Sequence, residues 1–332
     1  MLLSLALASA GVYALACGED ASGGGGGGGN GGDGGGGTLP EAAVGKTDAD
    51  APATTMRLAH VAADLGPVEF CYRAARSTSF EGPVLGGGIG DPKRDGGDDG
   101  GGAVSDASLD AADAGASAVG YRTVSRYLTL GAAGPLTLAL VAPGSTSCAS
   151  PLLFAYVTLD PGKLATVAIV GLGAGDGGAA ECGLVAFIDD RTTVPSEARV
   201  RMVNAAFGTA AAPTTPVALA VRAVGAQTIT LAERVEPKKA GSPSTAVPVD
   251  ALGYATIGPL PSPAQLAVGA AADTKTDAGV DSWVSTAGEL HLQGGSLHTG
   301  FVLTGEDAKP FEVLWCTDTS TSGDRTTCEL VR

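Results

Sequence analysis

The sequence has few of the residues that build zinc sites or nucleic-acid surfaces. Only three histidines occur in 332 residues, and no Cys-x-x-Cys pair is present, so the usual ligand spacing of a zinc site is missing. Lys and Arg number 20 against 35 Asp and Glu, a net charge of −15. We therefore expect no nucleic-acid partner, because phosphate binding requires basic surfaces. We also expect no metal and no cofactor.

Charged residues that favour helices are sparse as well, since only 17% of the chain is Asp, Glu, Lys or Arg. Glycine is abundant instead, with 52 residues, and this composition favours short strands and turns over helices. Two glycine-rich segments, residues 18–55 and 82–118, each carry a net charge of −5. The remainder is only mildly acidic, which indicates solubility rather than an acidic recognition face.

The N-terminus has the features of a lipoprotein export signal. Residues 2–16 are apolar and uncharged. They are short for a bilayer span of about 20 residues but match a signal-peptide core. Ala14-Leu15-Ala16-Cys17 resembles a bacterial lipobox, in which the cysteine thiol receives a lipid. We predict a signal peptide over 1–16, lipidation at Cys17 and a glycine-rich tether over 17–55. A plain secretory signal is the alternative.

Such a chain would be exported and held to a membrane by its lipid. Gly18, in place of Asp, follows the predicted lipidated cysteine. By resemblance to enterobacterial sorting, this favours the outer membrane or cell surface over retention at the inner membrane.

Past the tether, one pattern of elements occurs twice. Residues 56–61 (MRLAHV) open the first copy and residues 200–205 (VRMVNA) open the second. The matches continue as 67–74 with 216–223, 127–131 with 254–258, and 159–162 with 292–295. Each copy closes on a strand, at 184–190 and at 312–318, where we align Trp315 with Phe187. Trp315 is therefore expected in the core.

About seven strands are expected in each copy. In the first they lie near 56–62, 67–73, 122–130, 135–142, 152–160, 164–171 and 183–190. This spacing predicts an all-β fold of two immunoglobulin-like antiparallel β-sandwich domains. We place domain 1 at 56–195, with a disordered Gly/Asp insertion at 82–118, and domain 2 at 196–332. Val68, Phe70 and Tyr72 should face the core.

These repeats resemble the domain-of-unknown-function 4397 (DUF4397) family. The shared features are the Arg-x-x-His/Asn opening (Arg57 to His60, Arg201 to Asn204), the Pro-Val strand, a Tyr-x-x-Leu/Ile-Gly element (127–131 and 254–258), and a Gly-x-x-x-Thr strand. The resemblance covers about 56–190 and 198–320. It implies secreted or cell-surface bacterial domains with a sandwich-like fold, often in tandem, and it implies no activity and no catalytic residues.

In an exported protein the cysteines are expected to form disulfides. Cys316 and Cys328 flank a turn signal at 322–324, so we predict that they are bonded. If successive strands alternate in direction, Cys71, Cys148 and Cys182 lie at one end of domain 1. A reduced Cys71 would be exposed beside Glu69 and Arg73, so we predict a Cys71–Cys148 bond that leaves Cys182 out.

The same end would carry the insertion at 82–118 and the long loops at 223–248 and 270–282. Rigid sandwiches usually carry recognition on loops, so we expect this end to form the binding surface.

Three patterns resemble sites but are better explained by structure. Gly173, Gly175 and Gly178 form a GxGxxG, yet too few residues follow for the helix of a dinucleotide fold. A calcium loop built from Asp95, Asp98 and Asp99 lacks the spacing of known calcium motifs, so a disordered insertion is favoured.

Two nucleophile pairs, His60 with Cys71 and Ser296 with His298, are also weak. Asn204 replaces His60 in the second copy, which fits a structural hydrogen bond. Ser296 and His298 would stand about 7 Å apart on a strand. Trp283 is either core or an exposed binding aromatic. We therefore expect no enzyme but a surface binding or adhesion module with an unknown ligand or protein partner; an accessory envelope protein without a ligand is the alternative.

Overall fold

A computed structural model describes residues 53–63, 65–85, 118–171, 182–206, 216–223, 228–260, 264–271, 284–304, 311–318 and 326–331. Every regular element in these ranges is a β-strand, and none of the ranges contains a helix able to cross a membrane. The all-β sandwich prediction is confirmed. Several predicted features lie outside the described residues: the signal peptide, Cys17, the tether to residue 52, residues 86–117 of the insertion with its aspartates, the GxGxxG segment and Trp283.

The first sandwich consists of two facing sheets. One contains β1 (Thr54–His60), β3 (Thr123–Val124), β4 (Leu128–Leu130), β7 (Leu164–Val170) and β8 (Gly183–Asp189), in the order β3-β1-β7-β8 with β4 also on β1. The other is β2 (Glu69–Ala74), β5 (Gly134–Val141) and β6 (Leu153–Leu159), in the order β2-β5-β6. Val68, Phe70 and Tyr72 point into the core between them, as the alternation predicts.

The second sandwich repeats this plan. One sheet has the order β12-β9-β15-β16-β17, from β9 (Ala198–Asn204), β12 (Tyr254–Ile257), β15 (Leu297–Thr304), β16 (Phe311–Asp318) and β17 (Thr326–Val331). The facing sheet has the order β11-β10-β13-β14, from β10 (Val217–Ala223), β11 (Ile229–Val235), β13 (Ala264–Ala270) and β14 (Val284–Leu290). Trp315 is buried in the core between them, as expected.

The pairing differs from the expected antiparallel pattern at one place in each domain. β1 pairs with β7 in parallel, and β9 pairs with β15 in parallel. These strands are far apart in sequence, so the long chain between them allows either direction. The turn before each later strand carries a glycine with positive φ, Gly162 at 70° and Gly295 at 80°, which supports the matching of 159–162 with 292–295.

The register of the last strands corrects the predicted alignment of Trp315 with Phe187. Arg57 lies opposite Thr166, which lies opposite Phe187. In the second domain Arg201 lies opposite Thr299, which lies opposite Cys316. Phe187 is therefore equivalent to Cys316, and Asp189 to Asp318. A shift of one residue reverses the face of every side chain, so Trp315 and Phe187 point to opposite faces of their sheets.

Three strand predictions also need correction. The single strand expected at 122–130 is divided into β3 and β4. The segment 223–248 is not one long loop, because β11 lies within it and pairs with β10. β17 was not expected; it follows the last predicted strand and adds an edge to the sheet of β16.

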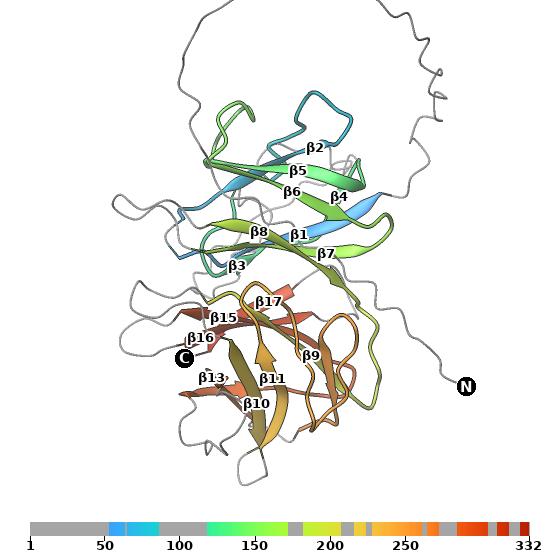
Figure 1. Cartoon of the computed structure of the whole chain (residues 1–332), viewed down its shortest axis with the longest axis vertical. Helices are drawn as coiled ribbons and strands as arrows, with labels where there is room; N and C mark the ends of the chain where they lie inside the picture. The colour runs from blue at the N-terminus through green and yellow to red at the C-terminus, as the bar shows by residue number, and fades with distance from the viewer. Residues whose placement is uncertain are drawn as a thin grey trace, which may run out of the picture.

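The two sandwiches pack face to face, so that four sheets are stacked along the long axis (Figure 1). The sheet of β1, β7 and β8 meets the sheet of β9, β15 and β16. An apolar cluster fills the space between them: Ala59, Val61, Val124, Ala168, Val170, Val185, Phe187, Val203, Ala205, Phe301, Leu303, Leu314 and Cys316. These two sheets are therefore buried on both faces, which explains why β1 and β9 contain almost no exposed position.

Both expected disulfides are present. Cys71 on β2 is bonded to Cys148 with a Cα–Cα distance of 6.1 Å, and Cys316 is bonded to Cys328 directly across β16 and β17. Cys182 is in neither bond and is buried against the first core. The expected exposure beside Cys71 is wrong for Glu69, which is 1% exposed, because Gly144 in the loop after β5 donates its N–H to the carboxylate at 2.9 Å.

Candidate functional site: a buried charge network between the domains

Both domains place the same four residue types on the sheet that faces the other domain. In domain 1 these are Arg57, Tyr127, Thr166 and Asp189. In domain 2 they are Arg201, Tyr254, Thr299 and Asp318. The arginine is the second residue of each repeat, and each guanidinium lies over the ring of its own tyrosine, at 4.9 Å in domain 1 and 4.7 Å in domain 2. The repeat therefore builds one polar motif twice.

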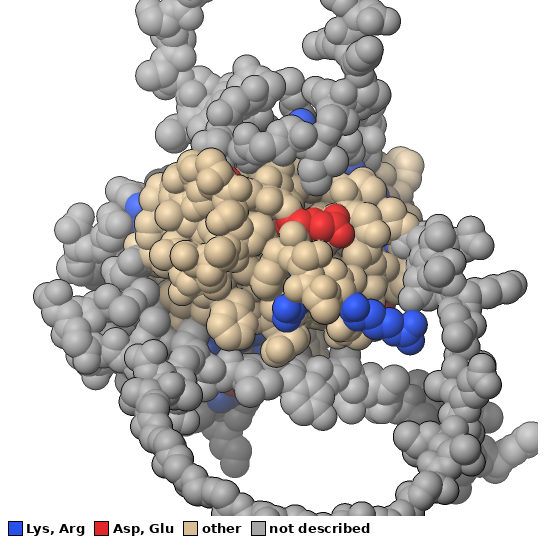
Figure 2. All heavy atoms as spheres, turned by 90° about the horizontal axis from the view of Figure 1, so that it is seen from above, with Lys and Arg blue, Asp and Glu red and all other residues tan. Residues whose placement is uncertain are grey.

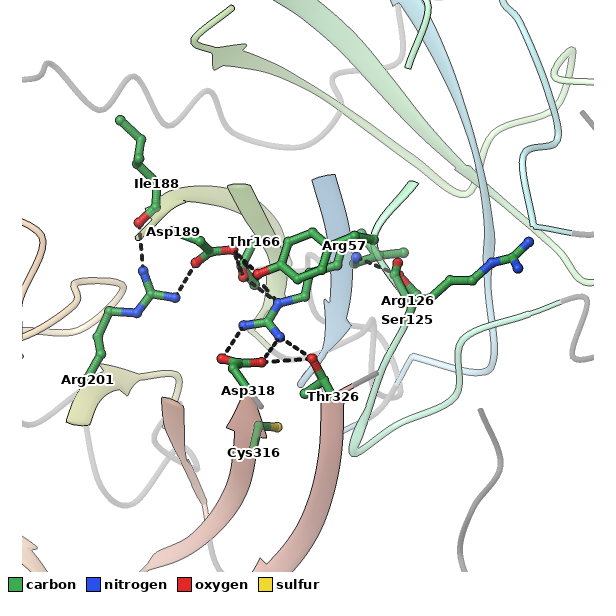
Figure 3. A network of polar contacts seen from close by, with 12 residues as sticks. Arg57, Ser125, Arg126, Thr166, Ile188, Asp189, Arg201, Cys316, Asp318 and Thr326 are labelled. Atoms are coloured by element: carbon green, nitrogen blue, oxygen red, sulfur yellow. Dashed lines mark hydrogen bonds and ion pairs between the residues drawn. The ribbon is translucent and has the colours of Figure 1, made fainter. Parts of the chain in front are cut away.

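Arg57 connects the two domains (Figure 3). Within its own domain its Nε donates to Thr166 Oγ1 at 2.8 Å. Its two terminal nitrogens donate to the Asp318 carboxylate of the other domain, one of them to Oδ2 at 3.0 Å. Nη1 also donates to Thr326 on β17 at 2.7 Å. This bidentate arrangement is the strong form of an arginine–carboxylate pair.

Arg201 makes the reciprocal contact. Its Nη2 donates to Asp189 of domain 1, and its Nη1 donates to the carbonyl of Ile188 at 2.8 Å. Asp189 also accepts hydrogen bonds at Oδ2 from Thr166 at 2.6 Å and from Tyr127 at 2.8 Å. Each arginine thus pairs with the aspartate of the other repeat, in the manner of a two-fold symmetric dimer interface within one chain.

The network is closed to solvent. The side chains of Arg57, Arg201, Asp189 and Asp318 are between 0% and 3% exposed. Two charges buried in this way are stable only when they are well paired, and removing one partner typically costs about 3–5 kcal/mol. A third ion pair between the domains joins Arg122 to Glu312, at the opposite end of β16 from Asp318.

The pKa values of the network follow from burial and pairing. Burial alone would raise the pKa of Asp189, but the charges of Arg201 and then Arg57, with a hydrogen bond from Thr166, lower it below its ordinary value. The same effects hold Arg57 protonated, because burial lowers its pKa and the carboxylates of Asp318 and Asp189 raise it by more. Burial raises the pKa of Tyr254 to about 12. Asp189 and Arg57 therefore stay ionised, and Tyr254 stays neutral, at physiological pH.

The two halves of the network are not equally satisfied. Thr166 accepts from Arg57 and donates to Asp189, whereas its equivalent Thr299 has no hydrogen-bond partner at Oγ1. Tyr127 donates to Asp189, whereas the hydroxyl of Tyr254 has no partner among the described residues. Asp318 instead accepts a hydrogen bond from Thr326 on β17, at 2.7 Å.

Ser296 and His298 contradict the distance expected from the sequence. Ser296 Oγ lies 2.8 Å from His298 Nε2, because the serine is in the turn before β15 and not on the strand. His298 Nδ1 contacts Thr317 Oγ1 at 3.1 Å, and its ring stacks on Trp315 at 5.1 Å. The regular spacing of side chains along a strand holds only within the strand. Because Ser296 lies in the turn before β15, its distance from His298 does not follow that spacing, and the predicted separation is wrong.

The geometry of this contact does not suit an activated nucleophile. Ser296 donates its proton to the carbonyl of Gln293 at 2.6 Å, so its oxygen accepts from the imidazole. Burial also lowers the pKa of His298 to about 4, far from the neutral range that a general base requires. We interpret the pair as a link that fixes the turn.

The remaining candidate residues have structural contacts. His60 Nε2 donates to the carbonyl of Gly66 at 2.9 Å, and Asn204 donates to the carbonyl of Val235 at 3.0 Å, so both repeats use this polar position to hold a loop. His60 is not paired with Cys71, which is in a disulfide. In the part of the chain that the structure describes, no cluster of His, Cys, Asp or Glu could hold a metal ion.

Sequence reasoning missed the charge network. Its signal was the recurrence of Arg, Tyr and Asp at matching places in the two repeats, but an alignment shifted by one residue hid the two aspartates. The predicted loop-rich binding end lies largely outside the described residues and stays a prediction.

Comparisons with known proteins give no family. No protein-family model matches the chain, and a search of curated proteins found no match. Among solved structures, the chain is similar to one titled "The Bacillus anthracis TIE protein", at 7% identity and a TM-score of 0.19. That alignment covers 76% of this chain and 34% of that one, so the chain spans about a third of its length.

Proposed function

We propose that the protein is an exported, non-catalytic lipoprotein of the cell envelope that presents its two sandwiches as one rigid unit for binding at the cell surface. The observation that carries this proposal is the reciprocal pairing of Arg57 with Asp318 and Arg201 with Asp189. Its charged groups are sealed from substrate, so the network serves to fix the domains and not to perform chemistry. The lipobox-like Ala14-Leu15-Ala16-Cys17 and the resemblance of the repeats to DUF4397 domains support the location.

Two sandwiches that are fixed to each other bind differently from two domains that move independently on a tether. Domains that move independently hold their surfaces at no fixed angle, whereas two clamped sandwiches present one continuous surface and lose less entropy on binding. The apolar layer between the domains, which includes Phe187 and Phe301, adds to the ion pairs. The unit is therefore suited to adhesion or ligand capture.

The lipid anchor is tested by labelling. Cells that express the full chain are grown with radiolabelled palmitate, and the wild type is compared with Cys17→Ala and with the control Cys182→Ala. We expect label in the wild type and in the control and none in Cys17→Ala. Equal label in all three proteins, or no label in any, would disprove lipidation at this residue.

The rigid unit is tested by cutting the linker. A protease site is introduced at the exposed Val194, between β8 and β9, and the chain is cleaved after folding. The two halves should elute together from a sizing column, and Arg57→Met should release them at a lower denaturant concentration. Immediate separation of the wild-type halves would contradict the proposal.

A further inference from the structure

The edge strand β6 has an unusual surface. Among the described residues it is hydrogen-bonded to β5 alone, so no strand is paired with its other edge, and β8 of the facing sheet lies close to it. Phe154 and Tyr156 on β6, and Leu152 immediately before it, alternate on its outer face and are 61%, 64% and 56% exposed. Val194 is the one other exposed large hydrophobic residue in the described part of the chain. The exposed apolar side chains are therefore gathered on a single strand.

Two other edge strands carry charges that discourage pairing, because Glu233 on β11 and Glu329 on β17 are exposed. β6 has the sequence LFAYVTL, with no charge, no proline and no glycine. Natural proteins normally protect edge strands with such residues, because an open edge accepts another strand. The lack of protection at β6 indicates that the edge is used.

We propose that β6 pairs antiparallel with β6 of a second copy of the chain. The two three-stranded sheets would join into one sheet of six strands, related by a two-fold axis beside Ala155. Phe154 of each copy would then lie opposite Tyr156 of the other, and Leu152 opposite Thr158. Cross-strand aromatic pairs of this kind stabilise sheets, and a two-fold contact closes after two copies.

Charge favours a second copy over another partner. The chain carries a net charge of −15, and the −10 that belongs to residues 18–55 and 82–118 opposes the approach of two copies at these segments. The end of the molecule formed by the sheet of β2, β5 and β6 is mostly uncharged, as Figure 2 shows from above. β6 itself is neutral, so two copies meet there without like charges opposed. The strand also has no charge by which to select a foreign sequence, whereas antiparallel pairing with itself places Phe154 opposite Tyr156 and Leu153 opposite Val157.

The first test is cross-linking of the full chain on cells. In Ala155→Cys the two introduced thiols would face each other across the axis, at a Cα separation of about 4.5–5.5 Å that permits a disulfide. We expect a dimer on a non-reducing gel that disappears after reduction. The matched control is Thr327→Cys, on the exposed face of edge strand β17, which should stay monomeric. Cross-linking that is equal in the two variants, or absent in both, would overturn the proposal.

The second test is a charge exchange on the purified full chain. In the proposed pairing, the double variant Phe154→Lys with Tyr156→Lys places a lysine of one copy opposite a lysine of the other at two positions. The double variant Phe154→Glu with Tyr156→Glu places two glutamates opposite each other in the same way. Each variant alone should associate at least about tenfold more weakly than the wild type in sedimentation velocity. An equimolar mixture should form a one-to-one complex.

Both variants change exposed positions, and circular dichroism reports whether they fold. The proposal fails if the wild type is monomeric at every concentration, whether or not it binds an added extended peptide. It also fails if the mixture of the Lys and Glu variants does not associate.

Discussion

The unequal hydrogen bonding of two equivalent threonines gives a sharp test of the charge network. Thr166→Val removes the acceptor of Arg57 Nε and a donor to Asp189, whereas Thr299→Val removes a hydroxyl that has no partner. Each change replaces a hydroxyl group by a methyl group of similar size, and both sites are 0% exposed. A hydrogen bond to a charged group contributes about 1.5–3 kcal/mol. Thr166→Val removes two such bonds and should therefore cost about 3–6 kcal/mol, whereas Thr299→Val should be neutral or slightly stabilising.

Urea unfolding measures the two free energies of unfolding. Far-ultraviolet circular dichroism follows the strands, and the fluorescence of Trp283 and Trp315 follows domain 2. Coincident curves indicate that the two domains unfold together. Equal m-values are required before the midpoints are compared. Equal losses in the two variants, or a loss below about 1 kcal/mol in Thr166→Val, would refute the reasoning from satisfied and unsatisfied hydroxyls.

Three further predictions use the same assay. Arg57→Met and Asp318→Leu should each cost about 3–5 kcal/mol, while the double variant should recover most of the loss, and additive losses would contradict a direct pair. His298 has a pKa of about 4 in the folded protein against 6.5 in the unfolded chain. The part of the unfolding free energy that depends on neutral His298 is therefore fully present above pH 6.5 and is lost as the pH falls to 4. His298→Gln should reduce the change of the urea midpoint with pH in that window. Replacing Cys316 and Cys328 with Ala should cost about 3 kcal/mol, and an unchanged midpoint would rule out the bond.

Much of the fold was predictable because each repeat alternates strictly where one face is buried. Val68, Phe70 and Tyr72 were placed correctly by alternation alone, and the turns at 159–162 and 292–295 marked the strands that follow. The Cys71–Cys148 bond was predicted from two premises, the ends at which strands meet and the exposure of Cys71 beside Glu69, and the bond is present although Glu69 is buried. Parallel pairing of β1 with β7 could not be deduced, since alternation gives the face of a residue and not the direction of its neighbour.

The charge network was hidden for a different reason. An arginine in a strand normally indicates a solvent-facing position, and Arg57 and Arg201 follow the outward side of the alternation correctly. What the sequence does not state is that another sheet covers that outward face. The partner aspartates lie 261 residues and 12 residues away along the chain, so no local pattern connects them to the arginines.

The reciprocal pairing also limits how the two repeats can diverge. In a true two-fold dimer the two halves of the network would be identical, but β17 exists only in the second domain and supplies Thr326 to Asp318. Among the described residues, Tyr254 and Thr299 lack the carboxylate partner that Tyr127 and Thr166 have. Arg57 and Asp189 therefore carry the better-bonded half of the clamp. Substitutions at domain 1 positions should consequently disturb the interface more than the same substitutions at their domain 2 equivalents.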